Sequence, residues 1–271
     1  MDNIELFGRF LGAGYLPKEL PPPFHSTSFA QFTEAILQAW QPNGRQSPRT
    51  RSDVYSFPRH ARSRRRLSVP NPISHFYLAK HICENWQPIS ERIQKSGISL
   101  FNPQMSTEAS RVFDPLNFDE IEAKKNSGLS RCDKALMVDV SRFYPTIYTH
   151  SIAWALHGKD WCKQHVEKKE LRDSLGQVLD DLVRKGQDRQ SLGIPLGPDT
   201  SIVLAEILGS AIDQKLENEL HINDEIAFRY TDDFFIGMRD GRTPESTLAA
   251  IARERIRVGG WLRQNACDCV C

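Results

Sequence analysis

The spacing of apolar residues predicts short strands joined by tight turns. Residues 54–57 and 67–69 carry apolar side chains on either side of a basic segment, which is typical of a hairpin. Residues 135–140 form a continuous apolar run that ends close to an acid, as in a buried strand. Residues 226–230 and 234–237 flank a short acidic turn, so we expect a second hairpin with carboxylates at its tip.

Apolar residues three or four positions apart predict helices over much of the remaining chain. The expected helices cover residues 28–40, 72–94, 150–157, 167–186 and 199–220, with another that begins after Thr243. The residues before this first helix are expected to be irregular, with a proline-rich turn at 20–24. Hairpins mixed with helices of this length predict an α+β fold with an antiparallel sheet.

The composition is that of an ordinary folded chain. It has 271 residues, 39% of them hydrophobic, with 35 Lys and Arg against 34 Asp and Glu. These values and a mean hydropathy of -0.47 exclude collagen-like, wholly disordered and membrane-spanning classes. The length fits one large domain or two lobes. A net charge of +1 does not exclude a nucleic-acid partner, because an average hides a basic patch balanced by an acidic one.

One segment is strongly positive. Residues 45–66 contain one acid, Asp53, and eight arginines: Arg45, Arg49, Arg51, Arg59, Arg62, Arg64, Arg65 and Arg66. Such a run is either a solvated loop or a phosphate-binding hairpin, since guanidinium groups held on a hairpin bind phosphate bidentately.

No secretory signal or membrane segment is visible, so no membrane partner is expected. The six cysteines lack the paired spacing of a zinc site and the density of a disulfide scaffold. We therefore expect a reducing, cytoplasmic location.

Three acids occupy positions where carboxylates are costly. Asp139, Asp232 and Asp233 lie at the ends of apolar strands, where a buried carboxylate must be protonated, paired or bound to a cation. Oxygen ligands from two neighbouring strands suit Mg²⁺, and two such ions support in-line phosphoryl transfer. The other acidic doublet, Asp180-Asp181, lies in an amphipathic stretch and is expected to be a solvated helix face.

Three motifs in this order resemble those of a reverse transcriptase. Residues 139–144, an aspartate followed by two aromatics, resemble the first catalytic motif, and residues 230–233 (Tyr-Thr-Asp-Asp) resemble the YxDD hairpin. Between them, residues 193–198 (Gly-Ile-Pro-Leu-Gly-Pro) resemble the motif under the template and incoming nucleotide. The match runs from about residue 54 to about residue 252. It implies the fingers and palm of a right-hand polymerase, with an antiparallel palm sheet and packed helices.

The resemblance implies specific roles for the motif residues. The catalytic residues would be Asp139, Asp232 and Asp233, and the same three with Val140 would bind two Mg²⁺ ions, or Mn²⁺ in their place. The implied nucleotide-binding residues are Tyr144, Phe143, Arg65, Arg66, Pro195 and Gly197. Tyr144 would lie against the sugar and exclude a 2′-hydroxyl, although a core tyrosine below the strand is the alternative. Arg65 or Arg66 would grip the triphosphate.

Further segments are similar to bacterial retron-type and abortive-infection polymerases of antiphage defence. These segments are residues 20–24, 143–152 and 197–201, whereas Leu196 replaces a glutamine that many relatives carry. The similarity implies an RNA-directed DNA polymerase that uses dNTPs. Its partners would be an RNA template or structured RNA, the DNA product and a protein of a defence system. Some members extend DNA from a protein hydroxyl even without a template.

The same resemblance divides the chain into an N-terminal extension (1–53), fingers (54–130), a palm with interleaved fingers helices (131–252) and a tail (253–271). The tail has a Gly-Gly break, no lysine and three clustered cysteines, which make a poor tetrahedral metal site. We expect this C-terminus to be frameshifted or otherwise aberrant, and the thumb to be missing.

Two other functions remain open. An inactive, truncated fragment of the fold would bind nucleic acid or a partner protein without catalysis. Another two-metal palm enzyme, such as a nucleotide cyclase, would also use aspartates on strands. Residues 193–198 and the basic hairpin argue against the cyclase.

Overall fold

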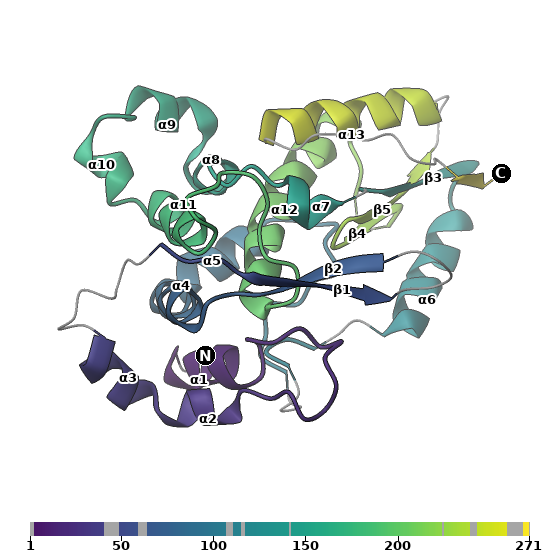
Figure 1. Ribbon diagram of the computed structural model, residues 1–271. Coiled ribbons are helices and arrows are strands. Elements are labelled where there is room, and N and C mark those ends of the chain that lie inside the picture. Colours follow the sequence, from purple (N-terminus) through teal and green to yellow (C-terminus); the bar gives the residue numbers. More distant parts are fainter. Residues whose placement is uncertain are drawn as a thin grey trace.

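The computed structural model describes residues 3–40, 49–58, 64–106, 111–114, 117–140, 142–223, 225–238, 243–258 and 268–270. The helices are α1 (Asn3–Gly12), α2 (Thr27–Gln31), α3 (Thr33–Trp40), α4 (Pro72–Glu84), α5 (Trp86–Ile93), α6 (Phe118–Leu129), α7 (Phe143–Thr146), α8 (Ser151–His157), α9 (Lys159–Gln164), α10 (Lys169–Arg172), α11 (Leu175–Lys185), α12 (Asp199–Leu220) and α13 (Pro244–Val258). The strands are β1 (Asp53–Pro58), β2 (Arg64–Val69), β3 (Lys134–Asp139), β4 (Ala227–Tyr230), β5 (Asp233–Met238) and β6 (Asp268–Val270). Figure 1 shows the two sheets that they form.

The larger sheet is antiparallel and has the strand order β4-β5-β3-β6. A tight turn joins β4 to β5, and β5 pairs with β3 from Met238 opposite Lys134 to Asp233 opposite Asp139. The backbone of β6 pairs with the other edge of β3. The last residue of β3 and the first residue of β5 therefore lie side by side at one end of the sheet.

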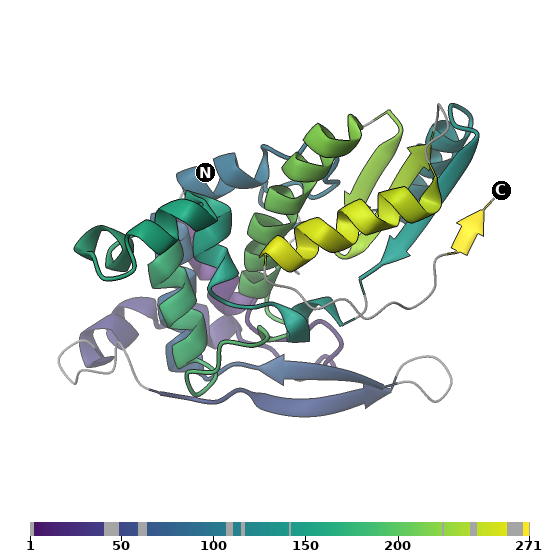
Figure 2. The same ribbon diagram turned by 90° about the horizontal axis from the view of Figure 1, so that it is seen from above.

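Side chains of this sheet alternate between two faces, as the strand period of two requires. Leu136 and Ile236 belong to the main hydrophobic core, which also contains buried residues of α12 and α13. Phe228 and Phe235 belong to a smaller cluster on the opposite face, which Ile121 of α6 completes. Figure 2 shows α12 and α13 next to each other against the sheet.

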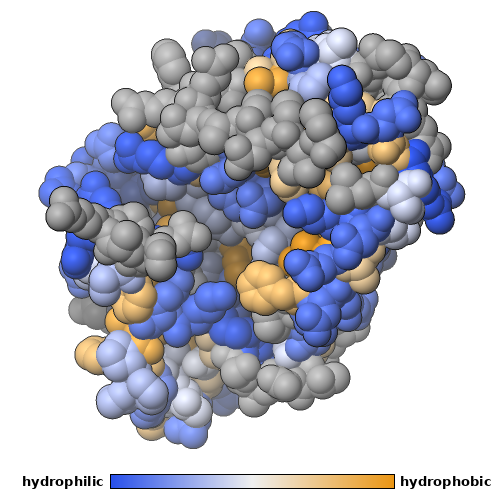
Figure 3. Space-filling model, turned by 90° about the vertical axis from the view of Figure 1, so that its right-hand side faces the viewer, coloured by the Kyte–Doolittle hydropathy of each residue, from blue (hydrophilic) through white to orange (hydrophobic). Residues whose placement is uncertain are grey.

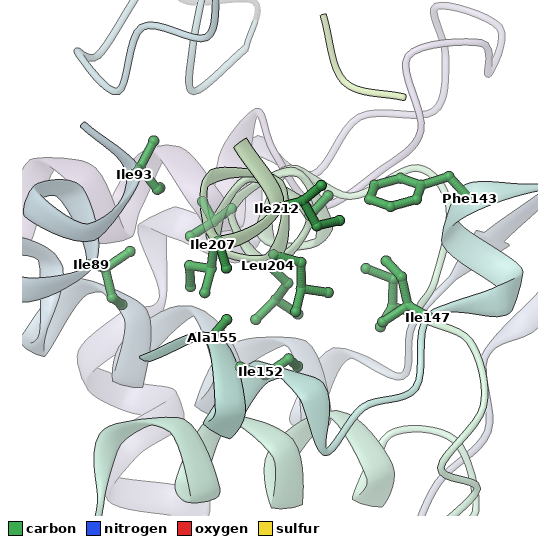
Figure 4. Close-up of a cluster of buried hydrophobic side chains, with 14 of the residues drawn as sticks. Ile89, Ile93, Phe143, Ile147, Ile152, Ala155, Leu204, Ile207 and Ile212 are labelled. Atoms are coloured by element: carbon green, nitrogen blue, oxygen red, sulfur yellow. The ribbon is translucent and has the colours of Figure 1, made fainter. Parts of the chain in front are cut away.

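Helix α12 is the centre of the helical part. Residues 199–213 are buried on nearly all sides of the helix, whereas the C-terminal turns reach the surface. On one side Ile207 packs near Ile89 and Ile93 of α5 and Ile152 of α8 (Figure 4). Full burial of each such side chain contributes about 1.5–3 kcal/mol to folding, so this contact fixes α12 firmly in place.

The smaller sheet is the hairpin of β1 and β2, which pair along their whole length. The backbone N–H of Ser68 on β2 donates to the carbonyl of Leu196 at 2.8 Å, so the hairpin is joined to residues 193–198. Residues 59–63, which contain part of the expected basic tip, lie outside the described residues. The face in Figure 3 is mainly hydrophilic and is hollowed near its centre.

The mixed α/β architecture with small antiparallel sheets is confirmed, but several helices differ from the sequence expectation. The N-terminus is not irregular, because α1 begins at Asn3 and buries Leu6 and Phe10. The expected helix over 28–40 is interrupted at Phe32, and the helix over 72–94 is interrupted at Asn85. No helix in the described residues is long and apolar enough to cross a membrane.

Candidate active site

The three acids singled out in the sequence lie together at one end of the larger sheet. Asp139 ends β3 and is the register partner of Asp233, which begins β5. The backbone N–H of Val140 donates to the carbonyl of Asp232 at 3.0 Å, which ties the end of β3 to the β4–β5 turn. Asp139 and Asp233 are exposed, and Asp232 is half-buried.

Asp139, Asp232 and Asp233 form what we call the carboxylate turn, and their charges act on one another. Burial, together with the neighbouring charges of Asp233 and Asp139, raises the pKa of Asp232 to about 6, against a lowering effect of Arg65. Among the described residues, neither Asp139 nor Asp232 forms a salt bridge. Three carboxylates close enough to repel one another favour a bound cation.

A buried ion network lies directly behind the turn. Arg229 on β4 is 1% exposed. Its Nε donates to both carboxylate oxygens of Asp213 at 2.9 Å, and its Nη1 and Nη2 donate to Glu206 at 3.1 and 2.8 Å. Nη1 also donates to the carbonyl of Thr231 at 2.9 Å. Because Glu206 and Asp213 already balance its charge, Arg229 holds the turn backbone without pairing with Asp232.

The backbone beside each proposed metal ligand is unusual. Thr231, just before Asp232, has a φ of 55°, and Arg142, three residues after Asp139, has a φ of 56°. Non-glycine residues in this left-handed region cost of order 1 kcal/mol and persist only where the surroundings fix them. The hydrogen bond from Arg229 to Thr231 supplies that fixation at the turn.

Sequence reasoning missed the Arg229 network, although it contained a signal. An arginine inside the apolar strand 226–230 needs a buried partner, and Glu206 and Asp213 lie seven residues apart in the expected helix 199–220, with mainly apolar residues between them. Seven residues are close to two helical turns, so both acids face the same side of α12. This spacing in the sequence is therefore compatible with a shared cationic partner on a neighbouring element.

The two aromatics after Asp139 have different surroundings. Phe143 is buried in the main core, whereas Tyr144 is partly buried and packs against it. Burial raises the pKa of Tyr144, as do the charges of Glu206 and Asp232, so its phenol lies within electrostatic reach of the carboxylate turn. Tyr144 is therefore both packed against the core and close to Asp232. This position is compatible with a core tyrosine and with a tyrosine beside the nucleotide sugar, the two interpretations that the sequence left open.

Residues 193–198 lie beside these aromatics. The N–H of Ile194 donates to the carbonyl of Tyr144 at 3.0 Å, and the N–H of Gly193 donates to that of Ile147 at 2.7 Å. Gly193 has a φ of 87°, and a Cβ on it would approach the carbonyl oxygen of Pro145 to 3.0 Å. Glycine is therefore required here by both conformation and space.

Gly197 lies against protein rather than in an open site. Its φ is 142°, and a Cβ on it would lie 2.4 Å from Pro17 and 3.2 Å from the carbonyl oxygen of Ser68. Its own carbonyl accepts from Arg111 at 3.2 Å. Gly197 thus lets the N-terminal segment and the hairpin approach this loop closely.

The two arginines proposed for the triphosphate have different environments, because successive strand side chains alternate in direction. Arg65 reaches the charge of Asp232 and forms a salt bridge with Glu19 at 3.4 Å. Arg66 instead lines a cavity of about 430 Å³ with Arg142 and Pro195. The structure therefore places Arg65, and not Arg66, toward the carboxylate turn.

The expectation that Asp180 and Asp181 form a solvated helix face is wrong for Asp180. Its side chain is 0% exposed, with the Nδ1 atom of His150 2.7 Å away and Arg184 4.0 Å away. Asp181 is on the surface, with Lys185 at 2.5 Å. The partner of Asp180 comes from the residue before α8, which the local helical pattern does not include.

The side chains of the residues expected to bind metal do not form a three-residue cluster in the described part of the chain. The described residues contain no group of three or more His, Cys, Asp or Glu side chains arranged to hold a metal ion. Asp139 and Asp232 interact electrostatically, and Val140 offers only a main-chain oxygen. The clustered cysteines of the tail, Cys267 and Cys271 among them, lie outside the described residues, apart from the backbone of Cys269 in β6.

Comparisons with known proteins give limited information. No protein-family model matches the sequence, and no curated protein matches it. Among solved structures, the chain is similar to telomerase from Candida tropicalis in complex with a TWJ fragment of telomeric RNA, with 13% identity and a TM-score of 0.47. The match covers 92% of this chain and 46% of the telomerase chain, so this chain spans about half of that length. At this TM-score the likeness carries no information about function.

Proposed function

We propose that this chain is an RNA-directed DNA polymerase that transfers nucleotides by two-metal chemistry. The observation that supports it best is the carboxylate turn, where Asp139 and Asp232 lie at the ends of neighbouring strands and neither forms a salt bridge among the described residues. An arrangement of like charges is unfavourable in the free protein, and binding of a divalent cation relieves it.

The residues at the turn fit Mg²⁺, or Mn²⁺ in its place. Asp139 and Asp232 would supply carboxylate oxygens and Val140 a main-chain carbonyl, with Asp233 beside them. Mg²⁺ keeps waters and substrate phosphate oxygens in its shell, so a set of two carboxylates is sufficient. When bound, two such ions activate a 3′-hydroxyl and stabilise the leaving pyrophosphate.

The remaining residues would position the nucleotide. Tyr144, held from behind by the core, would present its ring to the sugar and leave no room for a 2′-hydroxyl, which selects dNTPs. Arg65, which lies within electrostatic reach of Asp232, would neutralise the triphosphate. Arg229 would keep the turn backbone fixed while the substrate binds.

The finer assignment rests on the sequence motifs. Residues 143–152 and 197–201 favour the retron-type and abortive-infection group, and therefore a cytoplasmic role in antiphage defence with an RNA template or structured RNA. In this proposal residues 54–130 form the fingers and residues 131–252 the palm.

A non-catalytic role in binding nucleic acid or a partner protein is the second candidate. It is favoured by the lack of a three-side-chain metal cluster among the described residues. The basic hairpin would still bind phosphate in this case, because that contact needs no metal.

One assay tests these candidates. Purified protein is incubated with Mg²⁺ and labelled dNTPs or NTPs, with and without RNA template and DNA primer, beside an Asp232→Asn variant. Incorporation by the wild type that the variant lacks supports the polymerase. No incorporation under any condition leaves the binding role, and a small cyclic product points to a nucleotide cyclase.

A further inference from the structure

Three polar side chains from separate segments of the chain meet next to α8 and α11. Asp180 belongs to α11, His150 directly precedes α8, and Ser191 lies in the segment that leads to residues 193–198. The Nδ1 atom of His150 lies 2.7 Å from the carboxylate of Asp180, and its Nε2 atom lies 3.3 Å from the hydroxyl oxygen of Ser191. An acid, an imidazole and a hydroxyl are therefore connected in series, and the proposed polymerase reaction uses none of them.

The surroundings of Asp180 determine which ring nitrogen of His150 carries the proton. The Asp180 carboxylate is fully buried, and an ionised carboxylate only accepts hydrogen bonds. It accepts from the side-chain amide of Gln177 at 3.2 Å and lies 4.0 Å from Arg184, so Nδ1 of His150 is its third donor. With the proton on Nδ1, the Nε2 atom of neutral imidazole accepts from the hydroxyl of Ser191. This is the tautomer that a general base requires.

The imidazole and the hydroxyl are held in place and remain accessible. The ring of Tyr148 packs edge-on against His150, with 4.8 Å between the ring centroids. The backbone N–H of Thr149 donates to the carbonyl of Ser191 at 2.9 Å, which ties the two segments together. The side chain of His150 is 29% exposed and Ser191 is half-buried, so a small molecule reaches both from solvent.

A hydrogen-bond donor for a developing negative charge follows Ser191 directly. Leu192 is bridged to Tyr148 in an antiparallel pair whose flanking residues make the hydrogen bonds, so the N–H of Leu192 points away from the partner segment. Among the described residues this N–H donates no hydrogen bond, and Leu192 is 58% exposed. The N–H of the residue after a nucleophilic serine serves as an oxyanion donor in other acyl-transfer sites.

The hydroxyl of Ser191 lies apart from the proposed nucleotide site. Gln190 and Leu192 line the cavity of about 430 Å³ that also contains Arg66 and Pro195. Successive side chains of an extended segment point to opposite sides, so Ser191, which lies between Gln190 and Leu192, faces away from that cavity. Chemistry at Ser191 is therefore independent of the carboxylate turn and needs no divalent cation.

We propose that Ser191 is a nucleophile for acyl transfer from small activated carboxylic esters, with His150 as its general base and Asp180 positioning the imidazole. The hydroxyl oxygen forms a bond to the ester carbonyl carbon while Nε2 of His150 accepts the hydroxyl proton. The bond to the leaving alcohol then breaks, and His150 gives the proton to that alcohol. Water releases the acyl group from Ser191 as a carboxylic acid by the same two steps.

Labelling with an alkyl fluorophosphonate tests the nucleophile. The serine oxygen bonds to phosphorus and fluoride leaves, and peptide mass spectrometry gives the labelling rate of each serine. EDTA is present throughout. Ser174 is the internal control, because it is also half-buried but its hydroxyl donates to the carbonyl of Leu171 at 2.7 Å. His150→Gln is compared with His165→Gln, whose native imidazole contacts the Trp161 carbonyl at 2.8 Å.

We expect Ser191 to be labelled and Ser174 to stay unlabelled in the wild type. Labelling of Ser191 should be at least about 100-fold slower in folded His150→Gln, because a general base contributes at least that factor, and unchanged in His165→Gln. Absence of label on Ser191, or equal rates in His150→Gln and the wild type, overturns the proposal.

The ester itself is tested with p-nitrophenyl acetate in the same buffer. Ser174→Ala should release p-nitrophenol at the wild-type rate, whereas Ser191→Ala should release it at least about tenfold more slowly, since the remaining reaction lacks a positioned nucleophile. Equal release by the two serine variants overturns acyl transfer at Ser191.

The positioning role of Asp180 has a spectroscopic signature. Nitrogen NMR of the histidine side chains, assigned with His150→Gln, distinguishes the two neutral tautomers. We expect the wild type to carry the His150 proton on Nδ1, and folded Asp180→Asn to shift it toward Nε2. The same tautomer in both proteins would contradict this role.

Discussion

Two acidic doublets of the same composition have opposite surroundings. Asp180, in the first doublet, is fully buried and lies against His150 and Arg184, while its neighbour Asp181 contacts Lys185 on the surface. In the second doublet, Asp232 has two further carboxylates near it and no salt bridge among the described residues. A carboxylate with basic partners is therefore interpreted as structural, and one without them as a candidate metal ligand. Two adjacent aspartates in the sequence do not by themselves make this distinction.

The second doublet also has a buried cation, Arg229, close by that forms no salt bridge with Asp232. Arg229 lies three residues before Asp232 and bonds to the turn through the Thr231 carbonyl. Its charge is taken up by Glu206 and Asp213 of α12. The turn is therefore held rigidly while its own negative charge stays available.

The largest expected effect comes from removing one charge from each doublet, which tests whether Asp232 and Asp180 differ in their importance for activity. Asp232→Asn is expected to reduce dNTP incorporation by about 10³-fold or more, because several kcal/mol of metal-dependent charge stabilisation are lost. Asp180→Asn, measured in the same primer-extension assay, should retain activity within about tenfold as long as it is folded. A folded Asp180→Asn protein that is inactive would remove the distinction between the doublets.

The next largest effect concerns the network behind the turn. Arg229→Met should lower the free energy of unfolding by about 3–5 kcal/mol, because Glu206 and Asp213 are left buried without a counter-charge. Adding Glu206→Gln and Asp213→Asn should restore much of the loss. Urea unfolding followed by circular dichroism measures both, and an unchanged midpoint for Arg229→Met would show that the network does not support the fold.

His75 is a buried titratable group that stays neutral, in contrast to the charged aspartates of the two doublets. Burial lowers the pKa of His75 from 6.5 to about 4, against the effect of its hydrogen bond to the Phe10 carbonyl. Between these values the unfolded chain binds a proton that the folded chain does not, so stability falls as the pH falls from 6.5 to 4. The gap corresponds to about 3 kcal/mol.

His75→Gln tests this contribution. The variant should be less stable than the wild type at neutral pH, because it loses packing with Tyr15, but its stability should fall less steeply on acidification. Urea unfolding at several pH values gives both slopes. Parallel curves for the two proteins would mean that His75 is not the group that titrates.

The smallest expected effect is on stability, and it compares the two aspartates of the first doublet. Asp180→Asn should cost about 1–3 kcal/mol of stability, because His150 and Arg184 lose a buried charged partner. Asp181→Asn should change stability by no more than about 0.5 kcal/mol, as is usual for a surface ion pair. Thermal unfolding of the two variants compares them directly, and equal losses would contradict the difference in burial.

The parts of the site that could be predicted from the sequence are those set by local strand patterns. The acid at the end of residues 135–140 and the acidic turn after residues 226–230 define two strand ends, and antiparallel pairing brings Asp139 opposite Asp233. The alternation of side chains along a strand also explains why only one of Arg65 and Arg66 faces the turn.

The missed features depend on partners that are distant in sequence. Asp180 follows a solvated helical pattern until His150, from before another helix, covers it. Arg229 needs Glu206 and Asp213 from α12. Likewise, α1 was missed because its glycines weaken the helical signal, although Leu6 and Phe10 bury one side of it.

Our account depends above all on the proposal that the carboxylates of the carboxylate turn hold a divalent cation. Titration of the purified protein with Mn²⁺, followed by electron paramagnetic resonance, measures this directly and does not depend on catalysis. The account predicts that the wild type and Asp180→Asn bind Mn²⁺ with the same affinity, whereas Asp232→Asn binds at least about tenfold more weakly. Equal binding by Asp232→Asn and the wild type would contradict it.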